Sequence, residues 1–359
     1  MPKIKVLVID DSAVARKVLT EILSSDPEIE VIGTAADPFI ARSKIKELNP
    51  DVLTLDIEMP RMDGITFLRN LMRLRPMPVV MISTLTEKGA AITFEALEIG
   101  AVDFVSKPRQ DLANQLAHYA EQIILKVKMA ARANIRAKAD RVDAGPPEHR
   151  PPACRVMTKS PEISAGSRPS RRVVAIGAST GGTEAIKEVL TRLPENFPGI
   201  VIAQHIPAGF STSFAERMNR LSKMTVHEPT RTMSIQDGHV YIAPGDRHLK
   251  VRPGQGGGFE CYLEDGPAVN RHKPSVDVLF DSVAVHVGKK AYGVILTGMG
   301  ADGARGLKAM KEAGAYTIAQ NEATSVVWGM PGEAVKRGAV DEQLALEAIA
   351  QQLVDKLEV

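Results

Sequence analysis

Short apolar runs alternate with amphipathic segments along the first part of the chain. The runs near 4–10, 29–35, 51–56, 78–83 and 101–105 have the length of buried strands. Between and after them, apolar residues recur at helical spacing over 13–24, 38–48, 64–74, 87–99 and 110–131. Strands that alternate with helices in this way predict a parallel, doubly wound α/β sheet.

The second half of the chain repeats the alternation. Strands are predicted at 172–176, 200–203, 291–296 and 315–319, with helices at 183–193, 210–221 and about 302–313. Between them, 248–252 and 259–263 alternate as a hairpin does, around the turn Pro253–Gly258. We therefore expect a second doubly wound, mostly parallel α/β domain that carries an antiparallel hairpin.

A change in composition separates the two halves. The helical pattern fades after residue 131, and residues 145–170 are rich in Pro, Ser and Gly, which cannot build a core. A chain of 359 residues also favours two domains. We predict domains at 1–125 and 171–356, joined by a segment, 126–170, that is first helical and then flexible.

That linker is basic, with 12 Lys/Arg against 4 Asp/Glu between Lys126 and Arg172. Contact with nucleic acid or an acidic membrane is one interpretation, but aromatic residues and repeats are absent, which favours a solvated tether. The whole chain has a net charge of only +2, so no general electrostatic attraction to nucleic acid is expected.

Composition also bears on the compartment. No apolar stretch is long enough to span a membrane, and the N-terminal residues lack the apolar region of a signal peptide. Only two cysteines occur, Cys154 and Cys261, and no Cys/His spacing resembles a zinc site. We expect a cytoplasmic protein without a disulfide framework.

Polar residues follow the apolar runs of the first half. Asp10 and Asp11 close the first run, Asp56 the third, Ser83 the fourth and Lys107 the fifth. Strand C-termini share one edge of a parallel sheet, and ligands bind there. Clustered carboxylates suit Mg²⁺, and the set suits transfer of a phosphoryl group to a carboxylate. The simpler alternative is an acidic pair in a loop and one strand-end aspartate in any flavodoxin-like fold.

On these residues, positions 1 to about 125 resemble a two-component receiver domain, which has a flavodoxin-like (βα)5 fold. The resemblance implies that Asp56 accepts phosphate and that Mg²⁺ is held by Asp10, Asp11, Asp56 and the backbone carbonyl of Glu58. It also implies that Ser83 bonds the phosphate, that Lys107 pairs with it, and that Phe104 is the aromatic switch.

The second half carries a glycine-rich turn, Gly177–Gly182, between a strand and a helix. Such a turn can hold phosphate at the helix N-terminus, although the spacing of a P-loop or dinucleotide site is absent. It also fits Gly-x-Ser-x-Gly, the elbow that presents a nucleophilic Ser179. A purely structural turn, with Ser179 or Thr180 capping the helix, is the third interpretation.

A histidine and an aspartate end two further strands of the same predicted sheet. His205 follows 200–203, and Asp302 follows 291–296, so serine, histidine and aspartate share one edge, as in a catalytic triad. Asp302 could instead cap the next helix, Asp246 and Asp277 are competing acids, and the order Ser–His–Asp differs from α/β-hydrolases. The other histidines considered are His239, His248, His272 and His286.

Residues 172 to about 356 are similar to the catalytic domain of the chemotaxis response-regulator protein-glutamate methylesterase. The matching phrases are Ile176–Ile186, Gln204-His205, Tyr241–Asp246, Pro267–Phe280 and Leu296–Gly303. The resemblance implies Ser179 as nucleophile, His205 as base, Asp302 as orienting acid, and no cofactor in this domain. It places the oxyanion donor at the backbone N–H of Met299, with Thr180 as a second candidate.

The two resemblances together imply a phosphorylation-gated hydrolase for chemotaxis adaptation. It would demethylate glutamate methyl esters, and deamidate certain glutamines, on chemoreceptors, with a histidine kinase as phosphodonor and the receiver limiting access to the serine edge. We expect a monomer that binds no nucleic acid and meets the membrane only through receptors. A receiver fused to a non-hydrolytic binding module is the alternative; a transcription factor fits less well, because the last segment, 341–359, is acidic at several positions.

Overall fold

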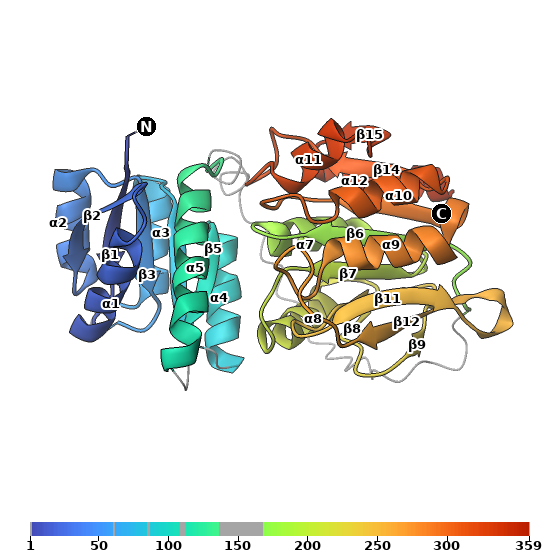
Figure 1. Ribbon diagram of the computed structural model, residues 1–359, viewed down its shortest axis with the longest axis horizontal. Helices are drawn as coiled ribbons and strands as arrows, with labels where there is room; N and C mark the ends of the chain where they lie inside the picture. Colours follow the sequence, from blue (N-terminus) through green and yellow to red (C-terminus); the bar gives the residue numbers. More distant parts are fainter. Residues whose placement is uncertain (1, 60–61, 85–86, 108–111, 136–167, 359) are drawn as a thin grey trace, which may run out of the picture. The chain divides into compact units, whose positions relative to one another are not determined.

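The computed structural model describes residues 2–59, 62–84, 87–107, 112–135 and 168–358 (Figure 1). The chain divides into two compact units, Met1–Ala144 and Gly145–Val359. Of the linker expected over 126–170, residues 136–167 lie outside the described residues. No helix of the described residues is long and apolar enough to cross a bilayer.

The N-terminal unit is a five-stranded sheet in the order β2-β1-β3-β4-β5, in which every neighbouring pair is parallel. Its strands are β1 (Ile4–Ile9), β2 (Ile29–Ala35), β3 (Val52–Asp56), β4 (Val79–Thr84) and β5 (Asp103–Lys107). Its helices are α1 (Ala13–Ser24), α2 (Pro38–Leu48), α3 (Gly64–Leu74), α4 (Glu87–Ile99) and α5 (Leu112–Ala131). The predicted flavodoxin-like fold is confirmed.

Polar residues start the first three helices of this unit. The side chains of Ser12, Asp37 and Asp63 accept hydrogen bonds from N–H groups in the first turns of α1, α2 and α3. These caps satisfy donors that a helix cannot satisfy itself. Each cap thus defines the residue at which its helix begins after the preceding strand.

The C-terminal unit contains a seven-stranded sheet in the order β15-β14-β13-β6-β7-β10-β8, and all of its pairs are parallel. Its strands are β6 (Val173–Ala178), β7 (Ile200–Gln204), β8 (Thr225–His227), β10 (His239–Ile242), β13 (Ala291–Ile295), β14 (Tyr316–Gln320) and β15 (Glu342–Leu344). A separate antiparallel sheet holds β11 (His248–Pro253), β12 (Phe259–Glu264) and β9 (Met233–Ser234). The expected fold class, with its hairpin, is confirmed.

The helices of this unit form two groups. Helices α7 (Gly182–Arg192), α8 (Phe210–Leu221) and α12 (Leu346–Leu357) pack together, as do α9 (Val276–His286), α10 (Ala304–Glu312) and α11 (Met330–Lys336). Right-handed crossovers place α7 and α10 on opposite faces of the sheet. Strand β6 pairs with β7 on one side and β13 on the other, so the connections reverse direction there.

Three strands of the main sheet, β8, β10 and β15, have no counterpart in the sequence prediction. All three are short. Strands β8 and β10 each place a buried histidine in the sheet, with His227 Nε2 2.8 Å from His239 Nδ1. Burial, together with His239, lowers the pKa of His227 to about 4. Because these two histidines are buried and hydrogen-bonded to each other, polar residues occupy positions where an apolar pattern would have revealed a strand.

Gly177 allows β6 and α9 to pack closely. A Cβ at this position would lie 2.2 Å from Val276 Cγ1 and 3.1 Å from Phe280 Cζ. Both neighbours are fully buried in the core of the C-terminal unit. The first glycine of the Gly-x-Ser-x-Gly phrase is thus required for packing.

Gly177→Ala should lower the free energy of unfolding of the C-terminal unit by about 1–3 kcal/mol, because overpacking displaces α9. The single tryptophan, Trp328, belongs to this unit, so its fluorescence during urea denaturation of the full chain reports on it alone. Gly266→Ala is the control: its nearest contact would be His248 Cδ2 at 3.7 Å, and we expect a change below about 0.5 kcal/mol. Equal urea midpoints for the two variants would contradict the packing argument.

Candidate active site and phosphoacceptor site

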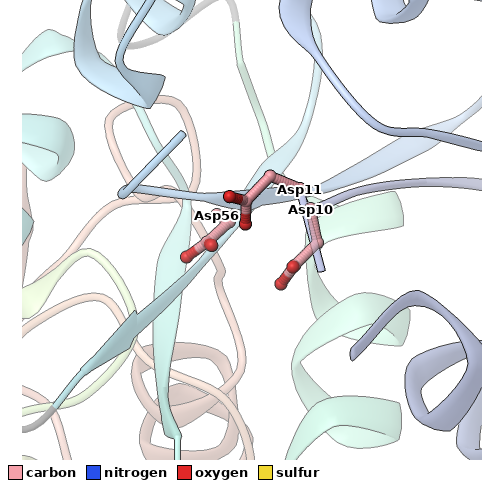
Figure 2. A group of neighbouring side chains, drawn as sticks. All are labelled: Asp10, Asp11 and Asp56. Atoms are coloured by element: carbon pink, nitrogen blue, oxygen red, sulfur yellow. The ribbon is translucent and has the colours of Figure 1, made fainter. Parts of the chain in front are cut away.

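In the N-terminal unit, the acidic residues predicted at strand ends converge. The carboxylates of Asp10, Asp11 and Asp56 offer ligand atoms that all lie within 4.8 Å of one another (Figure 2). Lys107 reaches them from β5, with its Nζ 3.0 Å from Asp10 Oδ2 and 2.9 Å from Asp56 Oδ2. The site lies where β1 has β2 on one side and β3 on the other, the position at which open α/β sheets bind ligands.

The charge balance of this cluster favours a cation. Burial, opposed by Lys107 and reinforced by Asp10, raises the pKa of Asp56 to about 6. Burial alone would lower the pKa of Lys107, but the carboxylates of Asp56 and Asp10 outweigh burial and raise this pKa. One lysine therefore leaves negative charge uncompensated among three carboxylates, and the oxygen-only donor set fits Mg²⁺.

The remaining residues expected in this site occupy distinct surroundings. Ser83 is buried at the end of β4, where its Oγ lies 2.8 Å from the Thr93 hydroxyl of α4. Phe104 is only 4% exposed, and Lys126 of α5 lies over its ring, with Nζ 5.0 Å from the centroid. Glu58 is exposed two residues beyond Asp56. Thr93 was not predicted from the sequence, since nothing in the periodicity of α4 distinguishes it.

In the C-terminal unit, the turn after β6 presents Ser179 at the carboxyl edge of the sheet. The Ser179 N–H donates to Thr297 O at 3.0 Å, and its carbonyl accepts from Gly182 N–H at 2.7 Å. Gly181 has φ +76°, and a Cβ there would lie 2.8 Å from Val326 Cγ2. Helix α7 has Gly181 as its N-cap and no side-chain cap, so Ser179 and Thr180 do not serve as helix caps.

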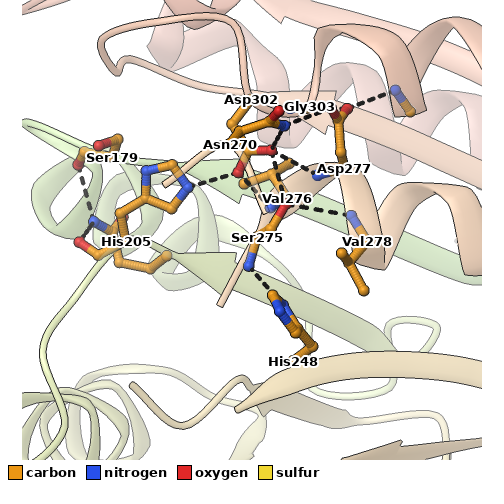
Figure 3. A network of polar contacts seen from close by, with 12 residues as sticks. Ser179, His205, His248, Asn270, Ser275, Val276, Asp277, Val278, Asp302 and Gly303 are labelled. Carbon is orange, nitrogen blue, oxygen red and sulfur yellow. Dashed lines mark hydrogen bonds and ion pairs between the residues drawn. The ribbon is translucent and has the colours of Figure 1, made fainter. Parts of the chain in front are cut away.

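His205 lies beside Ser179. Their strands are paired in register through Ala178 and Gln204, and the Gln204 amide donates to the carbonyls of Ser179 and His205 at 2.9 and 3.0 Å. The His205 ring lies between Ser179 and Asp302 (Figure 3). Its Nε2 is 2.8 Å from Asp302 Oδ2, while its buried Nδ1 has no hydrogen-bond partner among the described residues. Nδ1 is thus the nitrogen available to Ser179.

Asp302 is 3% exposed and accepts five hydrogen bonds from described residues. Besides His205 Nε2, the donors are Asn270 Nδ2 (2.7 Å), Ser275 Oγ (2.8 Å), Val276 N (2.7 Å) and Asp277 N (3.2 Å). Burial alone would raise the pKa of Asp302, but His205, Asn270 and the Val276 N–H outweigh it and hold the pKa well below its ordinary value. Asp302 is therefore a carboxylate at neutral pH.

The other acids occupy other positions. Asp302 does not cap the helix that follows it; the N-cap of α10 is Gly303, and Asp302 instead binds the first N–H groups of α9. Asp277, in α9, accepts from Gly303 N and Gly306 N at the start of α10. The first N–H groups of α9 are thus bound by Asp302, which precedes α10, and those at the start of α10 are bound by Asp277 of α9. Asp246 is exposed, and its Oδ1 lies 3.8 Å from the Nε of Arg247.

The remaining histidines also differ in their surroundings. His248 Nε2 is 3.0 Å from Pro267 O, and its Nδ1 accepts from the Ser275 N–H at 3.1 Å. Its two nitrogens are therefore used to hold the segment that leads into α9. His286 is exposed in the last turn of α9, and His239 pairs with His227. Only His205 contacts Asp302 among these rings.

The two residues predicted as oxyanion donors, Met299 and Thr180, lie in segments that adjoin Ser179 in the sequence or in the fold. Met299 follows β13, and its N–H has no hydrogen-bond partner among the described residues. Gly298 approaches the serine so closely that a Cβ there would lie 2.7 Å from Ser179 Cβ. Thr180 is buried, and its carbonyl accepts from Thr297 Oγ1 at 3.0 Å. The start of α7 adds positive potential at the same edge.

Three residues around the triad were missed as site components by sequence reasoning. Asn270 and Ser275 bind Asp302, and the His272 ring stacks on His205. All three lie between Val269 and α9, in a segment without apolar periodicity. The signal available was the density of polar residues in that phrase, which does not say which of them face the site.

Comparisons with known proteins cover both units. A family model described as CheB methylesterase matches residues 174–353, and one described as response regulator receiver domain matches residues 6–117. The protein-glutamate methylesterase/protein-glutamine glutaminase of Hydrogenovibrio crunogenus is 56% identical over 373 residues, covering 99% of each chain. That of Salmonella typhimurium is 51% identical over 357 residues, covering 99% of this chain and 98% of the relative. The crystal structure of the Thermotoga maritima CheB methylesterase catalytic domain is 38% identical, with TM-score 0.50, and covers 52% of this chain and 98% of that chain.

Asp302→Asn should destabilise the C-terminal unit by about 2–5 kcal/mol at pH 7, since it removes a buried, fully bonded charge. The pKa of Asp302 is lower in the folded than in the unfolded chain, so its contribution is complete above about pH 4–5 and is lost on further acidification. The gap in urea midpoint between wild type and variant, followed by Trp328 fluorescence, should therefore narrow below about pH 4. Asp246→Asn, at an exposed acid, should show no gap; a gap for Asp302→Asn that is independent of pH would contradict this assignment.

Proposed function

This chain belongs to the CheB methylesterase family and carries a response regulator receiver domain, and on that premise we propose that it is a phosphorylation-regulated serine hydrolase. It removes methyl groups from glutamate methyl esters on chemoreceptors and deamidates specific receptor glutamines, and so serves chemotaxis adaptation. The full-length similarity to relatives named for both activities supports the reaction class.

One observation carries the assignment of the chemistry to named residues. Ser179 and His205 directly follow two strands, β6 and β7, that are paired with each other. The Nε2 atom of His205 is held by Asp302, which remains ionised. With Nε2–H donated to Asp302, the neutral ring keeps its unprotonated Nδ1 for the serine hydroxyl. That is the division of labour a nucleophile, a base and an orienting acid require.

In the acylation step, Ser179 Oγ attacks the ester carbonyl carbon while its proton passes to His205 Nδ1. The imidazolium is stabilised by Asp302, which keeps its negative charge. The carbonyl oxygen becomes an oxyanion that the Met299 N–H can bind. When the tetrahedral intermediate collapses, the C–O bond to the methoxy group breaks, and methanol leaves with the proton from His205.

Deacylation repeats the sequence with water. His205 Nδ1 takes a proton from the water that attacks the glutamyl ester of Ser179, and the serine leaves with that proton. A glutamate side chain is released. A glutamine substrate differs only in its leaving group, because the first step then expels ammonia, so one set of residues supports both reactions.

The receiver residues support the control of this reaction. Asp56 accepts a phosphoryl group from the kinase, which we propose is a chemotaxis histidine kinase, and Lys107 and Ser83 bind the phosphate oxygens. Mg²⁺ held by Asp10, Asp11, Asp56 and the Glu58 carbonyl would offset the charge of the incoming phosphate. Phe104 responds to the position of Ser83. The protein acts as a cytoplasmic monomer that reaches the membrane only through its receptor substrates.

Ser179→Ala should reduce methanol release from methyl-labelled chemoreceptor membranes by a factor of roughly 10³ or more, because no acyl-enzyme can form. Phosphorylation of Asp56 should be unchanged, which distinguishes loss of the nucleophile from loss of the protein. Ser234→Ala, at an exposed serine of β9, is a serine control that should retain activity. Release near the wild-type rate in Ser179→Ala would remove Ser179 from this role.

Phosphorylation should control the hydrolase through Asp56. A small-molecule phosphodonor with Mg²⁺ should raise methanol release by the wild-type chain several-fold and leave Asp56→Asn at its basal rate. Asp51→Asn, at an exposed aspartate that accepts from the Lys5 N–H at 2.8 Å, is the matched control and should respond as wild type does. Stimulation of Asp56→Asn would place the phosphoacceptor elsewhere.

A further inference from the structure

A second imidazole ring covers the face of His205. The ring centroids of His205 and His272 are 3.6 Å apart, and the rings are inclined by only 10°. This is a full face-to-face contact and not an edge contact.

A tight turn holds His272 against the site. Val269 and His272 exchange both backbone hydrogen bonds, at 3.0 and 2.9 Å, and the two residues between them have positive φ. Those residues are Asn270 (φ 53°) and Arg271 (φ 68°), which is the conformation of a type I′ turn. Arginine rarely adopts this conformation, so the surrounding contacts must impose it.

The contact that imposes the turn comes from the triad itself. Asn270 Nδ2 donates to Asp302 Oδ1 at 2.7 Å and to Asp277 Oδ2 at 2.8 Å. Asn270 therefore fixes the turn to the orienting acid, and the turn places His272 on the base. One four-residue segment contacts both the acid and the base, by two kinds of interaction.

The His205 ring needs such a support. Among the described residues, the His205 side chain makes one hydrogen bond, from Nε2 to Asp302. The ring can still tilt about that bond, since the torsion of an aromatic ring is broad. A tilt moves Nδ1 away from Ser179. A flat surface at stacking distance limits that motion.

We propose that His272 is a positioning residue of the hydrolase, which holds the His205 ring in the plane that directs Nδ1 at Ser179. The inference rests on the proposed function of the Ser179 site and adds to it a residue that acts through the base. A planar ring at 272 is the requirement, so Phe should substitute for it and Ala should not.

The test uses the full chain with His272→Ala, His272→Phe and, as a matched control, His286→Ala at an exposed histidine of α9. His272→Ala should lower kcat for methanol release by roughly 10-fold to 100-fold with KM nearly unchanged, because misplaced catalytic groups cost rate and not ground-state binding. His272→Phe should recover most of that loss, and His286→Ala should match wild type.

A second readout does not depend on the natural substrate. The rate at which a fluorophosphonate labels Ser179 should fall in His272→Ala and recover in His272→Phe. Wild-type kcat and labelling in His272→Ala, or equal losses in the Ala and Phe variants, would overturn the proposal. A wild-type chain that releases no methanol, while its labelling still depends on the ring at 272, would refute the proposed substrate and leave the role of His272 standing.

Discussion

The catalytic unit is organised around one buried negative charge. A carboxylate withdrawn from water costs several kcal/mol unless hydrogen bonds replace its hydration. Asp302 obtains them from the end of β7, from the turn at Asn270 and from the first residues of α9. These segments are distant in sequence, so the requirement to satisfy the charge brings together the parts that form the site. The hydrogen bonds that stabilise this unit are for this reason the same ones that fix the geometry of the site.

The receiver presents the opposite electrostatic design. Asp302 has more donors than a carboxylate needs, and its pKa is low, whereas Asp56 shares one lysine with Asp10 and its pKa is raised to about 6. The first acid is fixed in one charge state and orients a neighbour. The second lies in a site that is short of positive charge, and a site of that kind responds to a cation or to a change in its own covalent state. The two aspartates are adapted to a constant role and to a variable one.

Sequence reasoning recovered what depends on regular periodicity. The alternation of strands and helices predicted both sheets, and the residues at strand ends, among them Asp10, Asp56, Ser179 and His205, lie at the edges expected of them because strand direction alone determines that edge. Strands of three or four residues, such as β8 and β10, carry too few positions for a pattern, and the buried histidine pair interrupts what pattern there is.

The residues that complete the sites were harder to predict. Asn270 and His272 reach the triad through a turn whose positive φ angles are imposed by contacts and not by glycine. Thr93 meets Ser83 because α4 packs against β4, and a lone threonine in a helix gives no sign of its neighbour. Such contacts depend on how elements pack in three dimensions. The period of a helix or strand predicts only which of its faces is buried.

The distances along the chain between partners have a consequence for synthesis. Lys107 and Asp10 are 97 residues apart, and so are His205 and Asp302. Closing loops of that size is among the slowest parts of folding, because the chain loses conformational entropy before the contact forms and stabilises it. A chain still emerging from the ribosome can hold a complete receiver while Asp302 has not yet been made. Under the proposed mechanism, a chain that ends before Asp302 lacks the carboxylate that orients His205, so full hydrolytic activity arises only after Asp302 has been synthesised.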